Sequence, residues 1–170
     1  MAIWQFELLF IPRERAIREL GSPEARMSAE QWDTTDWWSQ HQPPTDFQAR
    51  IAAILPACDS WSPEILMWGS EDLDRIHVCL DDSRQRVEEV SARFDLRRPC
   101  QQFARSISEL AQHADCVLAA WPHHTFEPSF DCLMTEIAGS ESARFVHAPR
   151  EYLEELARDP NKEARGWTHK

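Results

Sequence analysis

The chain has 170 residues, of which 42% are hydrophobic and 28% charged, a balance typical of a globular domain with a core of its own. With 18 basic against 29 acidic residues the net charge is −11, which disfavours binding to nucleic acid and to anionic membranes. No apolar run reaches the roughly 20 residues of a membrane-spanning helix, and the N-terminus lacks the basic start of a signal peptide. We therefore expect a single cytoplasmic domain over residues 1–170.

Neither the cysteine spacing nor any recognised motif assigns this chain a metal, a cofactor or a catalytic residue. An odd number of widely spaced cysteines, with no C-x-x-C pair, fits neither a disulfide framework nor a zinc ribbon. The chain also lacks glycine-rich phosphate loops, Walker patterns and the H-E-x-x-H signature. Thiols in apolar runs pack as small core residues, which is what we expect of most of the five, Cys58, Cys79, Cys100, Cys116 and Cys132.

The N-terminal third combines regular elements with an irregular, tryptophan-rich segment. Residues 3–11 predict a strand ended by Pro12, and residues 14–20 predict a short helix ended by Gly21. Residues 22–44 show no sustained hydrophobic period, and we interpret residues 22–63 as an insertion or a specificity segment.

Two short helical pieces are expected inside this segment. Ser28 and Gln31 have the spacing of a capping box, which predicts a turn of helix there. Residues 46–55 place their apolar side chains three and four apart, which predicts an amphipathic helix ended by Pro56.

Residues 65–97 predict an antiparallel meander at the centre of the fold. Three runs of β-branched and aromatic residues are separated by short polar connections. In the middle run, Ile76 and Val78 should face one layer while His77 and Cys79 face the other.

The remaining chain predicts mainly helices around one more strand. In chain order we expect a helix over 99–114, a strand buried on both faces over 116–121, a helix over 128–138, a short strand over 143–146, a helix from 149 and a frayed tail over 158–170. The sequence thus predicts an α+β fold with an antiparallel or mixed sheet of about five strands, covered by about three helices.

Acidic residues crowd both connections of the meander, without the spacing of a calcium-binding loop. They form either a solvated rim or an anionic surface that steers a basic protein partner into place. Tryptophans in irregular segments could anchor such a partner or cover a core edge, whereas those in strands should be core. The candidate partner-binding residues are Glu71, Asp72, Asp74, Asp81, Asp82, Trp32, Trp37, Trp38 and Trp61.

A second candidate site lies in the loop over residues 121–131, between a buried strand and a helix. Its residues His123, His124, Glu127 and Asp131 could bind a small ligand or a metal, or move protons in an enzyme. Their spacing matches no metal signature, so a polar loop without chemistry is the competing interpretation.

Several short motifs resemble small bacterial immunity proteins that are found beside polymorphic or Rhs-type toxins. The resemblance spans roughly residues 60–157 and is carried by Trp68-Gly69, by residues 75–78 and 92–97, and by Ser142-Ala143-Arg144-Phe145-Val146. It implies a non-enzymatic α+β protein that binds and occludes a toxin domain, and it assigns no individual residue a role. A homodimer formed through the tryptophans is a further alternative.

Overall fold

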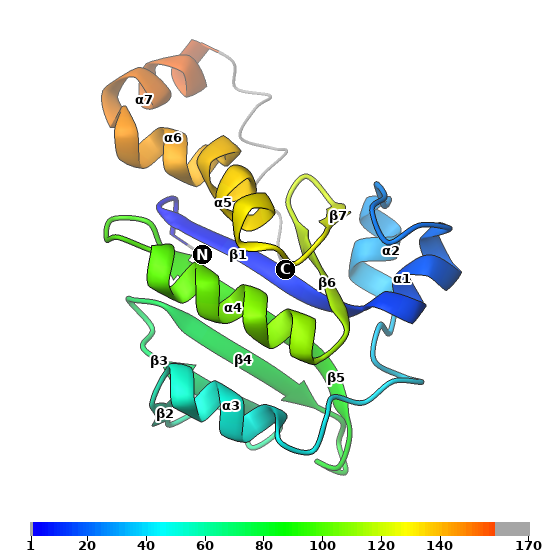
Figure 1. Ribbon diagram of the computed structural model, residues 1–170. Coiled ribbons are helices and arrows are strands. Elements are labelled where there is room, and N and C mark those ends of the chain that lie inside the picture. Colours follow the sequence, from blue (N-terminus) through cyan, green and yellow to red (C-terminus); the bar gives the residue numbers. More distant parts are fainter. Residues whose placement is uncertain (1, 159–170) are drawn as a thin grey trace.

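A computed structural model describes residues 2–158, which form an α+β fold around a seven-stranded antiparallel sheet (Figure 1). The strand order is β2-β3-β4-β5-β1-β6-β7. The predicted class and antiparallel pairing are confirmed, but about five strands was too few because β2 and β7, with two and three residues, are too short to show a period. The strands are β1 (Gln5–Pro12), β2 (Ala57–Cys58), β3 (Ile65–Gly69), β4 (Arg75–Leu80), β5 (Val87–Asp95), β6 (Cys116–Ala120) and β7 (His124–Phe126).

Within the described residues the chain forms seven helices, whereas the sequence predicted six helical segments and about three of them as cover for the sheet. The short strand predicted over 143–146 is wrong. These residues are helical because Ser140 caps the helix, its hydroxyl accepting a hydrogen bond from the Ala143 N–H at 3.1 Å. The helices are α1 (Arg13–Leu20), α2 (Ala29–Thr34), α3 (Phe47–Ile54), α4 (Gln101–His113), α5 (Phe130–Gly139), α6 (Glu141–His147) and α7 (Pro149–Arg158).

Local signals placed the ends of several helices correctly. The capping box of α2 is formed, since Ser28 and Gln31 exchange side chain to backbone hydrogen bonds of 2.9 and 3.1 Å. Helix α1 ends at Gly21, whose φ of 80° is the left-handed conformation that suits glycine. None of the helices in residues 2–158 has the length and apolarity needed to span a bilayer. Apart from Arg158, the predicted frayed tail lies outside the described residues.

Helices α3, α4 and α5 cover one face of the sheet (Figure 1). The centre of this core is aromatic. The ring centroid of Phe6 lies 5.9 Å from that of its cross-strand neighbour Phe94, and the ring centroid of Phe94 lies 4.7 Å from that of Phe103 in α4. Such edge and tilted contacts add to the hydrophobic free energy of burial.

The opposite face is covered unevenly. Helix α1 packs against β1 and β6, where Ile11, Val117 and Ala119 point away from α4 and are still fully buried. Residues 25–27 pair with the free edge of β7, through Thr125 N–H to the Ala25 carbonyl at 2.8 Å among other bonds. Over β3, β4 and β5 no helix of the described chain lies on this face, which we call the open face of the meander for that reason, although Arg75, Ser91 and Arg93 on it are buried (Figure 1).

The tryptophan-rich segment contributes to the core. Trp38 is 1% exposed, its ring lies 6.5 Å from Phe47, and its indole N–H donates to the Phe10 carbonyl at 3.1 Å. Trp37 is also buried. Both residues were candidates either to anchor a partner or to cover a core edge, and their burial agrees with the second role. Removing a large indole from water contributes favourable free energy to folding.

Gly69 ends β3 in a conformation that only glycine adopts easily. Its φ is 100°, and an added Cβ would lie 2.2 Å from the Asp74 carbonyl oxygen. We therefore expect Gly69→Ala to lower the free energy of unfolding by at least about 2 kcal/mol in urea titration. Gly139→Ala is the matched control, because a Cβ there meets nothing within 4 Å and a helical alanine should leave stability unchanged or raised. Equal urea midpoints for Gly69→Ala and the wild type would contradict the argument.

Candidate functional site

The two acidic connections of the meander lie at opposite ends of the sheet. Strand β4 joins them, and its six residues span roughly 17 Å at about 3.3 Å per residue. The two connections therefore do not form a single acidic surface, because consecutive connections in an antiparallel meander alternate between the two ends. The first group comprises Glu71, Asp72 and Asp74, and the second comprises Asp81 and Asp82.

Two of these carboxylates organise the backbone. Asp74 is partly buried, accepts a hydrogen bond from the Asp95 N–H at 2.9 Å, and has a pKa raised mainly by burial. Asp81 accepts from the N–H groups of Gln85 and Arg86 at 2.9 and 3.1 Å, which lowers its pKa. The side chains of Glu71, Asp72 and Asp82 are exposed and are the ones that a partner can reach.

Of the four candidate tryptophans, Trp61 is the one that projects into solvent, with 67% of its surface exposed. Trp32 is half-buried, its ring 4.8 Å from that of His123. Among the tryptophans expected in the core, Trp68 is buried and Trp4 is partly buried. Trp121 is 46% exposed, contrary to expectation, because β6 ends at Ala120 and Trp121 begins the turn that follows.

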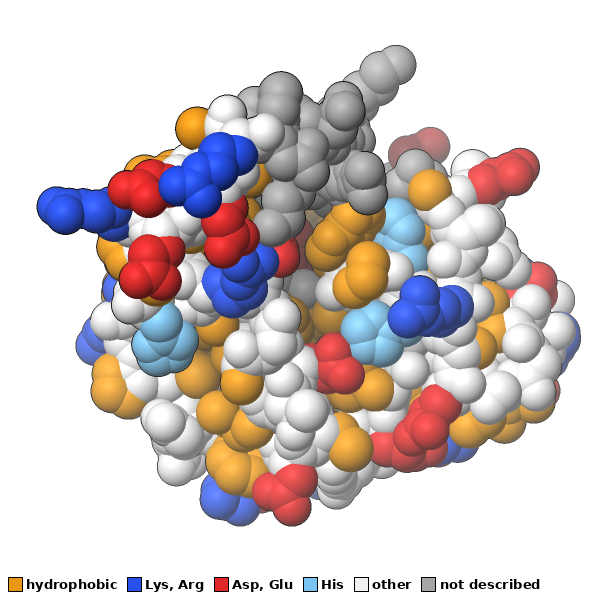
Figure 2. All heavy atoms as spheres, turned by 90° about the horizontal axis from the view of Figure 1, so that it is seen from above, with side chains coloured by type: hydrophobic (Ala, Val, Ile, Leu, Met, Phe, Trp, Pro, Cys, Tyr) orange, Lys and Arg blue, Asp and Glu red, His pale blue; other side chains and the backbone are white. Residues whose placement is uncertain are grey.

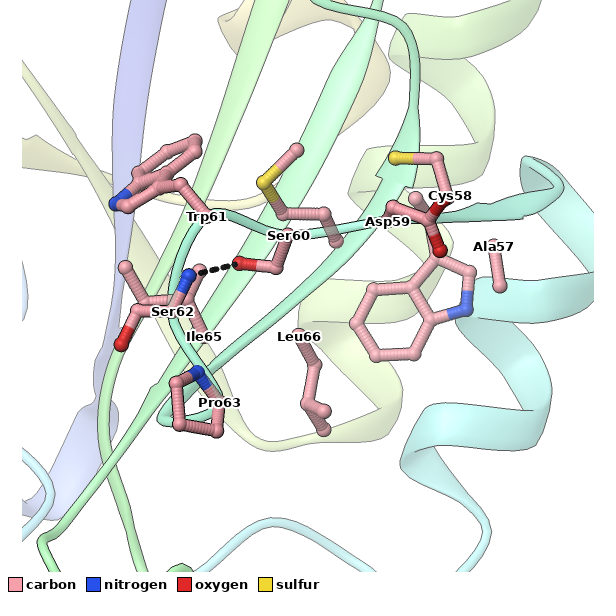
Figure 3. A pocket seen from close by; sticks show the side chains of 11 residues that line it. Ala57, Cys58, Asp59, Ser60, Trp61, Ser62, Pro63, Ile65 and Leu66 are labelled. Atoms are coloured by element: carbon pink, nitrogen blue, oxygen red, sulfur yellow. Dashed lines mark hydrogen bonds between the residues drawn. The ribbon is translucent and has the colours of Figure 1, made fainter.

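Trp61 borders an open groove of about 460 Å³ along the β2–β3 edge of the sheet (Figure 3). Ala57 and Cys58, on the side of the groove away from Trp61, are exposed and form the whole of β2. The edge strand is too short to pair along all of β3. The groove thus combines a large aromatic side chain with an accessible sheet edge, two features of protein-binding surfaces.

The ring of Trp61 also contacts the open face of the meander. It lies 5.5 Å from the ring of His77 and 5.8 Å from the guanidinium carbon of Arg75. Burial lowers the pKa of His77 to about 4, with further contributions from the charges of Arg75 and Arg93, so the imidazole is neutral at pH 7.

Sequence reasoning missed the two arginines of this face. Arg75 of β4 and Arg93 of β5 are directly opposite in the register and are 7% and 9% exposed. The strand alternation that placed His77 on this face also places Arg75 there, because the two are two residues apart. What the sequence did not reveal is the register that sets Arg93 beside Arg75.

The loop over 121–131 does not bring its candidate residues together. His123 lies between two aromatic rings, those of Trp32 and Trp121 at 4.8 and 4.4 Å. His124 pairs with Glu136 instead, with 2.9 Å between Nε2 and Oε2. Asp131 is exposed in the first turn of α5.

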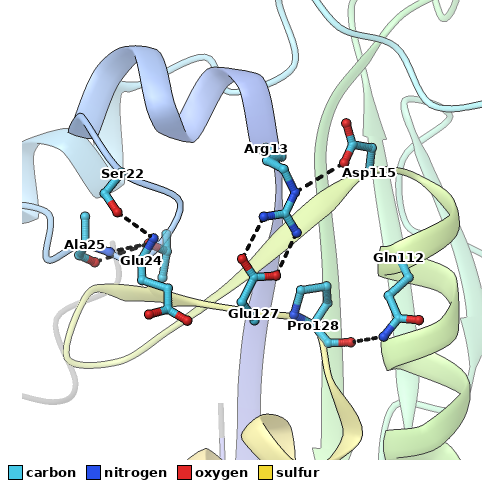
Figure 4. Close-up of polar contacts among 9 residues, drawn as sticks. Arg13, Ser22, Glu24, Ala25, Gln112, Asp115, Glu127 and Pro128 are labelled. Atoms are coloured by element: carbon cyan, nitrogen blue, oxygen red, sulfur yellow. Dashed lines mark hydrogen bonds and ion pairs between the residues drawn. The ribbon is translucent and has the colours of Figure 1, made fainter.

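Glu127, the fourth candidate of this loop, has a structural partner. Both of its carboxylate oxygens accept hydrogen bonds of 2.7 Å from Arg13, whose Nε also contacts Asp115 at 3.2 Å (Figure 4). This paired geometry lowers the pKa of Glu127. Across residues 2–158, no three histidine, cysteine or carboxylate side chains are placed to hold a metal ion.

Helices α6 and α7 present charges of both signs rather than a single-sign patch. Basic and acidic side chains are interspersed over this part of the surface, on the left of Figure 2. Arg144, for example, bonds to Glu141 at 3.0 Å and to Glu155 at 2.6 Å. Exposed ion pairs of this kind contribute little to stability, and their mixed charge makes them a poor steering surface.

Comparison of the chain with protein-family models, with curated proteins and with solved structures finds no match.

The Arg13–Glu127 pair gives a prediction for the pH dependence of stability. Since the folded-state pKa of Glu127 lies below its ordinary value of 4.5, the pair stabilises the fold above pH 4.5 and loses that effect as the pH falls through the folded-state pKa. We expect Glu127→Gln to lower the free energy of unfolding by about 1 kcal/mol at pH 7. The difference from the wild type should shrink in acid, as followed by urea titration at several pH values.

Glu109→Gln is the control for this series, because Glu109 is exposed on α4 and the change removes the same charge. Its stability should follow the wild type at every pH. A Glu127→Gln deficit that persisted undiminished well below pH 4 would show that the ion pair is not its cause.

Proposed function

We propose that the protein is a non-enzymatic binding module of the immunity type, which occludes a toxin domain through the surface around Trp61. The observation that carries the proposal is the exposure of Trp61 beside an open groove and a two-residue edge strand. Large aromatic side chains dominate the binding energy of protein interfaces, and Trp61 is the most exposed large hydrophobic side chain of the described residues.

Charge indicates the kind of partner. The chain has a net charge of −11, and the exposed acid Asp59 is two residues before Trp61. The exposed acids Glu71 and Asp72 lie close to Arg75 and Arg93, and the Trp61 ring is 5.8 Å from the guanidinium carbon of Arg75. A basic partner would be attracted over a distance of about 10 Å at moderate salt and would then be anchored by the indole. Acids outside this surface, such as Asp82 at the far end of β4, should contribute less to steering.

The competing functions receive less support from the described residues. An enzyme or metal protein using the 121–131 loop would need His123, His124, Glu127 and Asp131 to act on one centre, and each has a different environment. A homodimer formed through Trp61 would use the same surface, and the test below separates it from a foreign partner.

The first test uses the tagged protein to capture partners from a lysate of its source cells, followed by purification of the captured protein. We expect a basic partner whose affinity falls by about 30-fold or more with Trp61→Ala, the loss typical of an interface hot spot. Co-expression should suppress the toxicity of that partner with the wild type and fail to do so with Trp61→Ala.

Leu153→Ala is the matched control, since Leu153 is also a large exposed apolar residue, at 53%, but lies on α7. It should bind as the wild type does. If the partner binds Trp61→Ala with unchanged affinity, the proposed surface is wrong. If the only protein captured is the chain itself, and light scattering shows a dimer broken by Trp61→Ala, the homodimer is the correct alternative.

A second test addresses steering. The double change Glu71→Gln with Asp72→Asn should slow association with the basic partner by about threefold to tenfold at low salt, with a weaker salt dependence and little change in dissociation. Stopped-flow or surface-binding kinetics at two salt concentrations measure this.

Asp82→Asn serves as the comparison, because it removes an exposed charge at the other end of β4. For each charge removed, Asp82→Asn should slow association less than the double change does. Equal effects per charge at both ends would attribute steering to net charge alone.

A further inference from the structure

The open face of the meander contains two cationic side chains on directly opposed residues of neighbouring strands. Arg75 and Arg93 form a directly opposed cross-strand pair, in which Cβ atoms are roughly 5 Å apart, and like charges in such pairs are destabilising. Their side chains are 7% and 9% exposed, so water screens them poorly. The arrangement therefore lowers the stability of the folded protein when no ligand is bound.

The described residues leave these guanidinium groups incompletely paired. Arg75 forms no hydrogen bond or ion pair within residues 2–158, and its Nε is buried without a partner. The Nε of Arg93 is also buried without a partner, although one terminal nitrogen of Arg93 donates to the Glu71 carbonyl. Buried polar groups in folded proteins are nearly always hydrogen-bonded, and an exception marks a place where a partner is missing.

Nearby acids do not neutralise the pair. Glu7 is opposite Arg93 in the register, and Glu71 and Asp72 lie close enough to raise the pKa of Arg93. Even so, the pKa values of both arginines are lowered, chiefly by burial, and that of Arg75 is lowered further by the charge of Arg93. The positive charge is therefore under-compensated in a chain whose overall charge is strongly negative.

Two aromatic side chains complete the cluster. His77 lies on the same face of β4 as Arg75, and its Nε2 is buried without a hydrogen-bond partner. Trp61 reaches over from the loop before β3, its ring against both His77 and Arg75. Unpaired nitrogens on three neighbouring side chains, beside an indole that could cover a ligand, have the character of a binding site.

We infer that Arg75, Arg93 and His77 form a binding site for a small oxyanion, a carboxylate or a phosphate group, with Trp61 at its margin. A guanidinium is planar and matches both groups with paired, charge-assisted hydrogen bonds. A bound anion removes the electrostatic repulsion between the two guanidinium groups. Relief of this repulsion contributes favourable free energy to binding of the anion.

The inference does not rest on the toxin-binding proposal, although both involve Trp61. The site also differs in place from the 121–131 loop, where a ligand site was expected from sequence. Because Glu7, Glu71 and Asp72 oppose an anion, a bare ion should bind with a dissociation constant on the order of 1 mM. A physiological ligand that also stacks on Trp61 should bind more tightly.

The test titrates the protein with inorganic phosphate and, separately, with acetate, while chloride keeps the ionic strength constant. The imidazole NMR signals of His77 are followed as a function of ligand and pH. Saturable shifts are expected, with the pKa of His77 rising from about 4, because a nearby anion stabilises the imidazolium. Phosphate binding alone assigns the site to phosphate groups, acetate alone to carboxylates, and both to oxyanions in general.

Arg75→Gln and Arg93→Gln should each abolish saturation. Arg98→Gln removes the same charge from an exposed residue outside the cluster, and should bind as the wild type does. If one of the first two variants fails to fold, melting of the wild type at equal ionic strength provides the second measurement, since phosphate or acetate should raise its Tm above that in chloride. The proposal is overturned if His77 shows no saturable response to either probe, or if Arg98→Gln loses binding as completely as Arg75→Gln.

Discussion

Every layer of this molecule depends on the pairing of β1 with β5 on one side and with β6 on the other. Gln5 pairs with Asp95 and Leu8 pairs with Ala120, so the first strand joins two halves of the sheet that are distant in sequence. Without β1 the meander and the β6–β7 pair would share no hydrogen bonds. Such long-range pairing has a large loop-closure entropy, which the aromatic contacts of Phe6, Phe94 and Phe103 help to offset.

The position of β1 also explains the role of the tryptophan-rich segment. A strand in the middle of a sheet needs cover on both faces, and α1 supplies it on one of them near Ile11. On the other face Phe10 packs against Phe47, and Trp38 donates its indole N–H to the Phe10 carbonyl. Residues of the tryptophan-rich segment, which has no regular hydrophobic period, thus complete the core. Because both faces of β1 are buried, its sequence is nearly continuously apolar.

The meander is different because its two faces have different environments. Ile76 and Val78 are fully buried, whereas His77 and Cys79 on the open face are half-buried among charged neighbours. The apolar face contributes stability, and the polar face holds Arg75 and Arg93 in a state that is costly without an anion. Trp61 connects this face with the groove at the sheet edge, so the proposed protein surface and the proposed anion site share one aromatic side chain.

The sequence alone determined much of the local structure. Helix ends at Gly21 and Ser28, the strands of the meander and the buried stripe of α4 follow from spacing and capping, which act over a few residues. Prediction from the sequence failed for residues 143–146, where the local pattern is compatible with both a strand and a helix. It also failed for β2 and β7, which are too short to show the alternation of a strand. The α+β class was predicted because it depends only on such local patterns.

Only the tertiary structure decided which residues form a surface. Candidate tryptophans differed in exposure because burial depends on what packs above them, which put Trp38 in the core and left Trp61 in solvent. The two acidic connections are close along the chain, but the antiparallel path of β4 places them at opposite ends of the strand. Arg75 and Arg93 are 18 positions apart and become neighbours only through the register of β4 with β5, which is set by the whole sheet.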